Sequence, residues 1–262
     1  MTQKKAILLV SFGTSYLESK EKTIDRLLAD VAETFPDIPL YQAWTSNIII
    51  KILRTRSGLY IPTLPEAMET IAADGVEHLI IQPTHFLNGL ENDEMIRTIQ
   101  AHAPDHLQLA FCDPLLTTTE DHREVLDCLL SEYLPLSSEE AMVFMGHGTT
   151  HHANSVYAAL DYMLKETAHP NIFMGTVEAY PGLDTLIAQV KKTSAKRVHL
   201  VPFMLVAGDH ANNDMAGNHK DSWKSRFEAC GYEVICHLKG LGELQGVRNI
   251  YLKHLKRGTM DQ

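Results

Sequence analysis

Two histidines and one glutamate stand where strands of the expected fold end. His147 lies between two glycines, Glu178 follows an apolar segment, and His210 follows Gly208 and Asp209. Two imidazoles and one carboxylate form a mixed nitrogen and oxygen donor set, which suits borderline divalent ions such as Co²⁺, Ni²⁺, Fe²⁺ or Zn²⁺. Three protein ligands leave a coordination position open, as a catalytic or metal-transfer site requires.

Each of these residues also has an ordinary structural explanation. The spacings between them match no short metal-binding motif, and a histidine after a strand often hydrogen-bonds within the fold. His210 belongs to a polar run that could be a solvated loop. Glu178 ends an apolar stretch, where a carboxylate needs a partner, and a lysine or arginine could serve instead of a metal. The glycines beside His147 leave its imidazole accessible, which favours a functional role.

Short apolar segments alternate with helical patterns along the whole chain. We expect strands at residues 6–10, 40–44, 77–82, 107–112, 142–145, 172–177, 197–205 and 233–237. We expect a first helix that opens at residues 15–18 and ends at residue 35, and further helices at residues 47–56, 63–74, 91–102, 120–134, 152–166, 183–192, 221–230 and 242–256. Ser15 and Glu18 are predicted to form a capping box before the first helix. A repeated strand-then-helix order predicts parallel sheets with right-handed crossovers.

The second half of the sequence repeats the first. Residues 6–15 align with 141–150 at an offset of 135, and the segment with Pro83 and Gly89 aligns with the one carrying Pro202 and Gly208 at an offset of 119. We therefore predict an α/β fold of two similar, doubly wound parallel-sheet halves, residues 1–136 and 137–262, which face a central cleft.

The duplication also shows where the halves differ. The corresponding pairs are Phe12 and His147, Ala43 and Glu178, and Glu91 and His210. Only the second half therefore has imidazole, carboxylate and imidazole at the carboxyl ends of three successive strands, where ligands of α/β sheets bind. This places the predicted metal site in the C-terminal half.

Composition excludes several other classes of function. The chain has 262 residues, 45% of them hydrophobic, and a net charge of −10, which argues against nucleic acid or an anionic membrane surface as a partner. Its four cysteines form no C-x-x-C pair, and no apolar run is long enough to span a membrane, so we expect a cytoplasmic protein. No nucleotide-binding loop, dinucleotide fingerprint, nucleophile elbow or zinc-protease helix is present.

Four segments carry a family resemblance that covers nearly the whole chain. They read VSFGTSY at 10–16, VFMGHG at 143–148, VEAYP at 177–181, and MLVAGDHA at 204–211 followed by NDM at 213–215. The sequence resembles the anaerobic sirohydrochlorin cobaltochelatases of cobalamin biosynthesis, class II chelatases related in fold to ferrochelatase. The family's metal-binding histidine, glutamate and histidine match His147, Glu178 and His210.

This resemblance implies insertion of Co²⁺, as the substrate metal, into sirohydrochlorin without nucleotide hydrolysis. His147 is then the expected catalytic proton acceptor, because a neutral imidazole can take a pyrrole proton near neutral pH. Glu178 would balance charge and orient the ion. The expected macrocycle-binding residues are Ser11, Phe12, Gly13, Thr14, Ser15, His85, Asn88 and Gly89.

Other functions stay open at this point. Ligand type does not select cobalt over nickel or iron, so a nickel or iron chelatase for a related tetrapyrrole is an alternative. The same three residues could activate water in a zinc hydrolase. A tetrapyrrole or metal carrier without turnover is the non-enzymatic alternative. The sequence does not decide the oligomeric state, and a homo-oligomer is left open.

Overall fold

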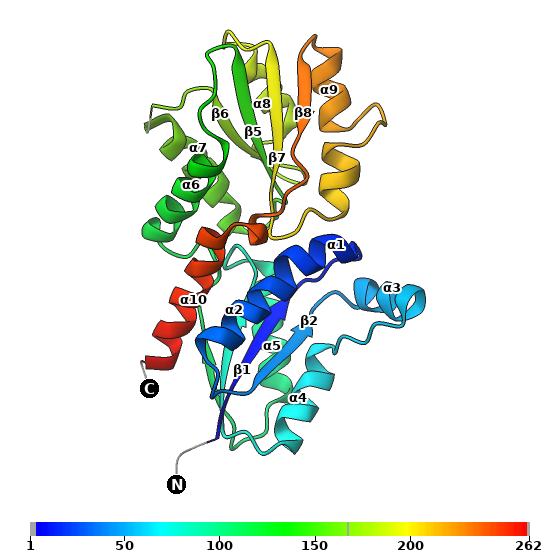
Figure 1. The fold of residues 1–262 in the computed structure, drawn as a ribbon, viewed down its shortest axis with the longest axis vertical. Coiled ribbons are helices and arrows are strands. Elements are labelled where there is room, and N and C mark those ends of the chain that lie inside the picture. The colour runs from blue at the N-terminus through cyan, green and yellow to red at the C-terminus, as the bar shows by residue number, and fades with distance from the viewer. Residues whose placement is uncertain (1–3, 167, 261–262) are drawn as a thin grey trace.

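The computed structural model describes residues 4–166 and 168–260. Within this part of the chain, the strands form two four-stranded parallel sheets, ordered β2-β1-β3-β4 and β6-β5-β7-β8. Their bounds are β1 Lys5–Ser11, β2 Leu40–Trp44, β3 His78–Pro83, β4 Gln108–Phe111, β5 Glu140–Gly146, β6 Ile172–Thr176, β7 Arg197–Phe203 and β8 Glu233–Cys236. The identical strand order confirms the predicted α/β fold of two similar halves, one above the other in Figure 1.

Helices cover both sheets. Their bounds are α1 Leu17–Lys20, α2 Arg26–Thr34, α3 Asn47–Ser57, α4 Leu64–Ala73, α5 Leu90–His102, α6 Thr119–Tyr133, α7 Ser155–Glu166, α8 Leu183–Val190, α9 Trp223–Ala229 and α10 Gln245–Met260. Short helical turns, π or 3₁₀ in type, are η1 Glu21–Asp25, η2 His152–Asn154, η3 Ala211–Met215 and η4 Leu241–Glu243. In the described part of the chain, no helix is both long and apolar enough to cross a membrane.

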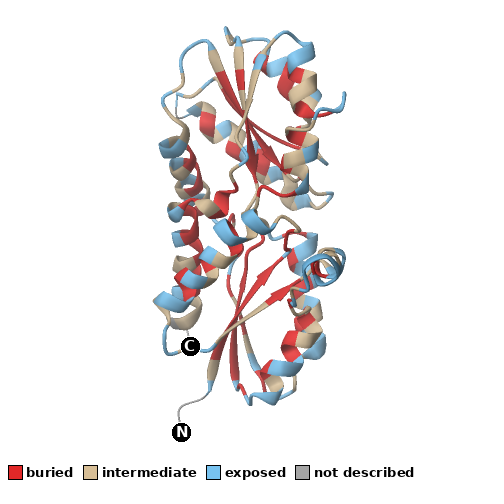
Figure 2. Ribbon diagram, turned by 45° about the vertical axis from the view of Figure 1, so that its right-hand side comes forward, coloured by how far each residue is buried: buried red, intermediate tan, exposed pale blue. Residues whose placement is uncertain are grey.

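The strands that lead to the site are buried on both faces. Residues 6–11 of β1 and 141–146 of β5 are all buried, as parallel strands covered by helices require. Figure 2 shows this buried centre in red, with the exposed surface on the outer faces of the helices. Such packing holds the carboxyl ends of the strands in fixed positions.

The last helix of the chain packs against the first half. In Figure 1, α10 runs from the second half down beside the first. The Tyr251 hydroxyl donates to the Thr84 carbonyl at 2.8 Å. Arg248 Nε donates to Asp30 Oδ2 of α2 at 2.6 Å, and both side chains are buried.

Helix α6, which follows the last strand of the first half, packs against the second half. The ring of Tyr133, at its end, meets Phe144 of β5 edge to face, with centroids 6.1 Å apart. One hydrophobic cluster therefore contains residues of both sheets. The division at residue 136 remains a prediction about folding units, because the two halves share α6, α10 and part of their core.

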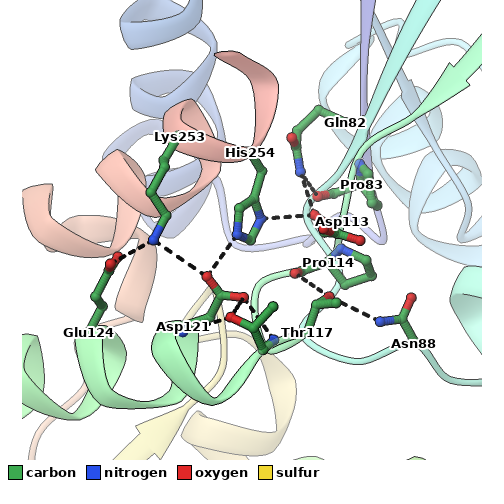
Figure 3. Close-up of polar contacts among 11 residues, drawn as sticks. Gln82, Pro83, Asn88, Asp113, Pro114, Thr117, Asp121, Glu124, Lys253 and His254 are labelled. Atoms are coloured by element: carbon green, nitrogen blue, oxygen red, sulfur yellow. Dashed lines mark hydrogen bonds and ion pairs between the residues drawn. The ribbon is translucent and has the colours of Figure 1, made fainter. Parts of the chain in front are cut away.

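A buried ion pair joins α6 to α10 (Figure 3). His254 Nε2 lies 3.0 Å from Asp121 Oδ1, and its Nδ1 lies 3.1 Å from the Asp113 carbonyl oxygen. The Asp121 carboxylate also accepts from the backbone N–H and the hydroxyl of Thr118. Burial alone would raise the pKa of Asp121, but the hydrogen bonds from His254 and Thr118 outweigh it and lower the pKa to about 2.

The predicted capping box of Ser15 and Glu18 is wrong. Helix α1 begins at Leu17 with Tyr16 as its N-cap, and no side chain caps it. Instead, Thr14 Oγ1 accepts the backbone N–H of Tyr16 at 3.2 Å. The helix therefore begins one residue later than the sequence pattern indicates. Its N-cap is Tyr16, which lacks a short side chain that could accept a hydrogen bond from the first turn.

Several predicted boundaries also shift. A 3₁₀ turn takes up residues 152–154, so α7 begins at Ser155 rather than at residue 152. The last helix begins at Gln245, after the turn at 241–243. Strand β6 ends at Thr176, one residue earlier than predicted, and this places Glu178 in a loop.

Candidate metal centre

Three loops at one edge of the second sheet carry His147, Glu178 and His210. His147 follows β5, Glu178 comes two residues after β6, and His210 lies between β7 and η3. Strands β6, β5 and β7 are parallel neighbours, so their carboxyl ends meet at the same edge. The topology therefore brings together three residues that are far apart in the sequence.

The three side chains converge. One potential ligand atom from each lies within 4.8 Å of the others, the one such grouping of His, Cys, Asp and Glu found among the described residues. His147 Nε2 is 4.0 Å from Glu178 Oε2, and His210 Nε2 is 4.0 Å from Glu178 Oε1. The Glu178 side chain is 54% exposed, so a ligand can reach the group. Glu178 therefore does not lie in the apolar strand end that the sequence indicates, but in an exposed loop.

Both histidines present the same nitrogen to the site. His147 Nδ1 lies 2.9 Å from the Gly148 carbonyl oxygen, and His210 Nδ1 lies 2.7 Å from Asp214 Oδ2. Since a carbonyl and a carboxylate only accept, each Nδ1 carries the hydrogen. With the hydrogen on Nδ1, each ring has its Nε2 on the side of Glu178, which is the nitrogen available to a metal.

The glycines around His147 are required by close packing. A Cβ on Gly146 would lie 2.2 Å from Tyr157 Cε1. Gly148 has a φ of +88°, and a Cβ there would lie 2.9 Å from the backbone nitrogen of Ala179. This close approach lets the Glu178 N–H donate to the His147 carbonyl at 2.9 Å. The Gly-His-Gly sequence thus joins the loop of His147 to the loop of Glu178.

The loop of His210 is held at its backbone. Asn212 Nδ2 donates to the carbonyls of Ala207 and Gly208 at 3.1 and 2.7 Å. Ser19, from the α1 end of the first half, accepts the N–H of Ala207 at 3.1 Å. The first half therefore helps to fix the position of a residue that belongs to the second.

Glu91 is a further residue of the site that the sequence prediction did not count. It lies in the first turn of α5, and its charge interacts with His147 and Glu178. Partial desolvation raises the pKa of the Glu91 carboxyl; His147 opposes this shift and Glu178 adds to it. The internal repeat could have identified it, because Glu91 in the first half aligns with His210 in the second half.

A cavity of about 630 Å³ lies in the first half of the chain, and Glu91 is one of the residues that line it. Its walls include Phe12, Leu90, Met95 and Trp44. Phe12 and Leu90 are 44% and 50% exposed, which is unusual for large apolar side chains. The space beside the charged cluster therefore has apolar surface available to a ligand.

The predicted macrocycle-binding residues divide by accessibility. Phe12, Ser15 and Asn88 reach solvent, and Asn88 donates to Thr117 Oγ1 at 3.0 Å (Figure 3). The others, Ser11, Gly13, Thr14, His85 and Gly89, are buried. Contact of these buried residues with a macrocycle stays a prediction.

Burial has different consequences for Ser11 and His85. Ser11 Oγ accepts the Thr84 hydroxyl at 3.0 Å, which ties the end of β1 to the segment after β3. Burial lowers the pKa of His85 to about 4, so this imidazole is neutral near pH 7.

Comparison with known proteins gives consistent results. The family described as "Cobalt chelatase (CbiK)" matches residues 5–260. The sirohydrochlorin cobaltochelatase of Salmonella typhimurium is 42% identical over 252 residues, covering 96% of this chain and 95% of that protein. The sirohydrochlorin cobaltochelatase CbiKC of Nitratidesulfovibrio vulgaris is 34% identical over 256 residues, covering 96% of this chain and 89% of that protein.

Solved structures support the fold independently. SirB from Bacillus subtilis with Fe³⁺ aligns with a TM-score of 0.66 at 16% identity, covering 99% of this chain and 97% of that one. A sirohydrochlorin chelatase SirB from Bacillus subtilis subspecies spizizenii, in complex with cobalt, aligns with a TM-score of 0.62 at 14% identity, covering 98% and 95%. At these identities the likeness concerns the fold.

Proposed function

The chain belongs to the CbiK family of cobalt chelatases, and we propose that it inserts Co²⁺ into sirohydrochlorin without hydrolysing a nucleotide. The convergence of His147, Glu178 and His210 is the observation that carries this proposal. Their two Nε2 atoms each lie 4.0 Å from a different oxygen of the same carboxylate. Such a group offers two neutral nitrogens and one negative oxygen to a divalent ion.

The ligand atoms stand slightly farther apart than they would around a bound ion. Ligands about 2.1 Å from a tetrahedral ion are roughly 3.4 Å apart. The separations of 4.0 Å from Glu178 to each imidazole are wider, so the loops would close slightly around the ion. Coordination positions outside the three protein ligands stay available for the pyrrole nitrogens.

Insertion requires two proton acceptors. As Co²⁺ forms bonds to the macrocycle, two pyrrole N–H bonds break and two protons leave, so the metallated ring is two protons lighter. His147 Nε2 takes one of them once the ion has moved to the ring nitrogens, because its lone pair is then free while Nδ1–H is held by the Gly148 carbonyl. Glu91 is our candidate for the second, because its charge interacts with His147 and Glu178 and its raised pKa makes the carboxylate a stronger base.

The surroundings fit a flat, largely apolar ring with polar arms. Phe12 and Leu90 offer apolar surface at the cavity beside Glu91, and Tyr180, two residues after Glu178, is 69% exposed. Ser15 and Asn88 are accessible polar groups for the carboxylate arms. Nickel and iron remain alternative metals, because donor type alone does not discriminate among these ions.

Anaerobic absorbance spectroscopy tests the proposal. Sirohydrochlorin and Co²⁺ are mixed with substoichiometric protein, without ATP, beside a reaction that lacks protein. The proposal predicts many equivalents of metallated product for each protein chain. Conversion that stops at one equivalent would instead establish a carrier, and a rate equal to that of the protein-free reaction would reject the chelatase function.

A further inference from the structure

The two histidines of the metal centre are held by different kinds of partner. His147 Nδ1 faces the backbone carbonyl of Gly148, whereas His210 Nδ1 faces the side-chain carboxylate of Asp214 at 2.7 Å. A backbone carbonyl comes with any residue at position 148. The partner of His210, by contrast, is a specific side chain on the following turn.

The local fold places that side chain under the ring. His210 immediately precedes the π-helical turn η3, and Asp214 lies four residues further on. Side chains with this spacing lie on the same face of a helical segment. Because Asn212 already fixes the backbone of the loop, rotation of the His210 ring and the choice of its protonated nitrogen are the remaining freedoms.

We propose that Asp214 is a positioning residue for metal capture, because it holds the His210 imidazole with its Nε2 lone pair directed at Glu178. This inference rests on the proposed role of His147, Glu178 and His210 as the site of the substrate metal. Asp214 does not itself reach the ion, and it acts through His210.

The expected consequence follows from the two ring nitrogens. With Nδ1–H bonded to Asp214, Nε2 is unprotonated and can donate its lone pair to the ion. Without that acceptor, His210 can carry its hydrogen on Nε2 and present a proton to the ion instead. Loss of such an outer partner typically weakens metal affinity about 10–100-fold.

Co²⁺ affinity in the absence of macrocycle tests this role. Binding is measured by competition with a chromophoric chelator, so no turnover is needed. We expect D214A to bind Co²⁺ about 10–100-fold more weakly than the unmodified chain. D214N keeps an oxygen that can accept from Nδ1, and we expect it to recover much of the affinity.

Asp209→Asn is the matched control. Asp209 lies beside His210 in the same loop, but its carboxylate accepts from Asn213 Nδ2 at 2.8 Å. We expect D209N to bind Co²⁺ within about twofold of the unmodified chain. An equal loss of Co²⁺ affinity in D209N and D214A would show that the negative charge of the loop explains the effect, and it would overturn the proposal.

A second measurement does not depend on the metal. The ¹⁵N chemical shifts of His210 in the metal-free protein report which ring nitrogen is protonated. We expect Nδ1–H in the unmodified chain and in D214N, and a mixture with Nε2–H in D214A. An unchanged tautomer in D214A overturns the inference. If H210A leaves Co²⁺ affinity unchanged, the proposed metal centre fails instead, and the ¹⁵N result then decides only whether Asp214 sets the tautomer of His210.

Discussion

The imidazole rings of His147 and His210 meet edge to face, with centroids 4.8 Å apart and planes at 79°. One ring comes from the loop after β5 and the other from the loop after β7. The equivalent positions in the first half hold Phe12 and Glu91. The duplicated fold thus repeats its scaffold, while one half has two imidazoles and the other contributes an apolar side chain and a carboxylate.

Replacement of His147 by alanine should nearly abolish metal insertion. The change removes the proposed proton acceptor, and the loss of general-base catalysis is typically about 10²–10⁴-fold. The side chain is 42% exposed, so we expect little loss of stability. Single-turnover absorbance measures the rate, while quenching of protein fluorescence by sirohydrochlorin measures binding. A rate equal to that of the unmodified protein at pH 7–8 would remove His147 from this role.

Replacement of Glu178 or His210 should act mainly on the metal. E178A removes the negative ligand and H210A removes one nitrogen, so we expect KM for Co²⁺ to rise more than kcat falls. Steady-state rates over a range of Co²⁺ concentrations separate the two constants. His102→Ala, an exposed histidine at the end of α5, serves as the control. A change in kcat alone would assign both residues to the chemical step rather than to metal capture.

The metal centre was predictable because topology fixes where strands end. The internal repeat and the family motifs single out the three residues, and parallel neighbouring strands must bring their carboxyl ends together. Glu91 was not predicted as a site residue, because its approach to His147 depends on how the two halves face each other. Likewise, the partnership of His210 with Asp214 depends on a π-helical turn that the sequence pattern does not indicate.

Replacement of Gly148 by alanine should disturb both stability and activity. A left-handed backbone at a non-glycine residue costs about 1–2 kcal/mol. At Gly148 the new Cβ would also lie 2.9 Å from the Ala179 backbone, which forces the loop of Glu178 to move. Urea denaturation measures the change in the free energy of unfolding, and the cobalt insertion rate measures the effect on the site.

Gly231→Ala separates the two causes. Gly231 has a φ of +91°, close to that of Gly148, and a Cβ there would meet no atom within 4 Å. We expect G231A to lose about 1–2 kcal/mol of stability from its left-handed backbone alone and to keep its activity. Equal stability and equal activity in G148A and G231A would show that the close approach at Gly148 is unimportant.

The buried pair of Asp121 and His254 should make stability depend on acid pH. The folded-state pKa of Asp121 is about 2, below its ordinary value of 3.8. Its contribution to stability is therefore complete above about pH 4 and is lost as the pH falls toward 2. Free energies of unfolding for the unmodified protein and D121N should converge over this interval.

Urea titrations at several pH values between 6 and 2.5 measure that convergence. Asp105→Asn, at an exposed position, is the control for a surface carboxylate and should follow the unmodified protein throughout. A constant difference between D121N and the unmodified protein down to pH 2.5 would show that Asp121 does not titrate in this range.

The sequence also did not predict that α6 packs against the second half and α10 against the first. The patterns of α6 and α10 predict where these helices begin and end to within a few residues. They do not specify which sheet each helix covers, since both halves offer apolar surface. That choice depends on particular pairs such as Arg248 with Asp30 and Tyr251 with Thr84, which join α10 to residues of the first half.

The location of bound Co²⁺ tests the central claim most directly. Crystals of the protein loaded with Co²⁺, without macrocycle, would give an anomalous difference map at the cobalt absorption edge. We predict a single strong peak about 2.0–2.2 Å from His147 Nε2, His210 Nε2 and one oxygen of Glu178. A peak bound by other side chains, with none among these three, would contradict this account of the site.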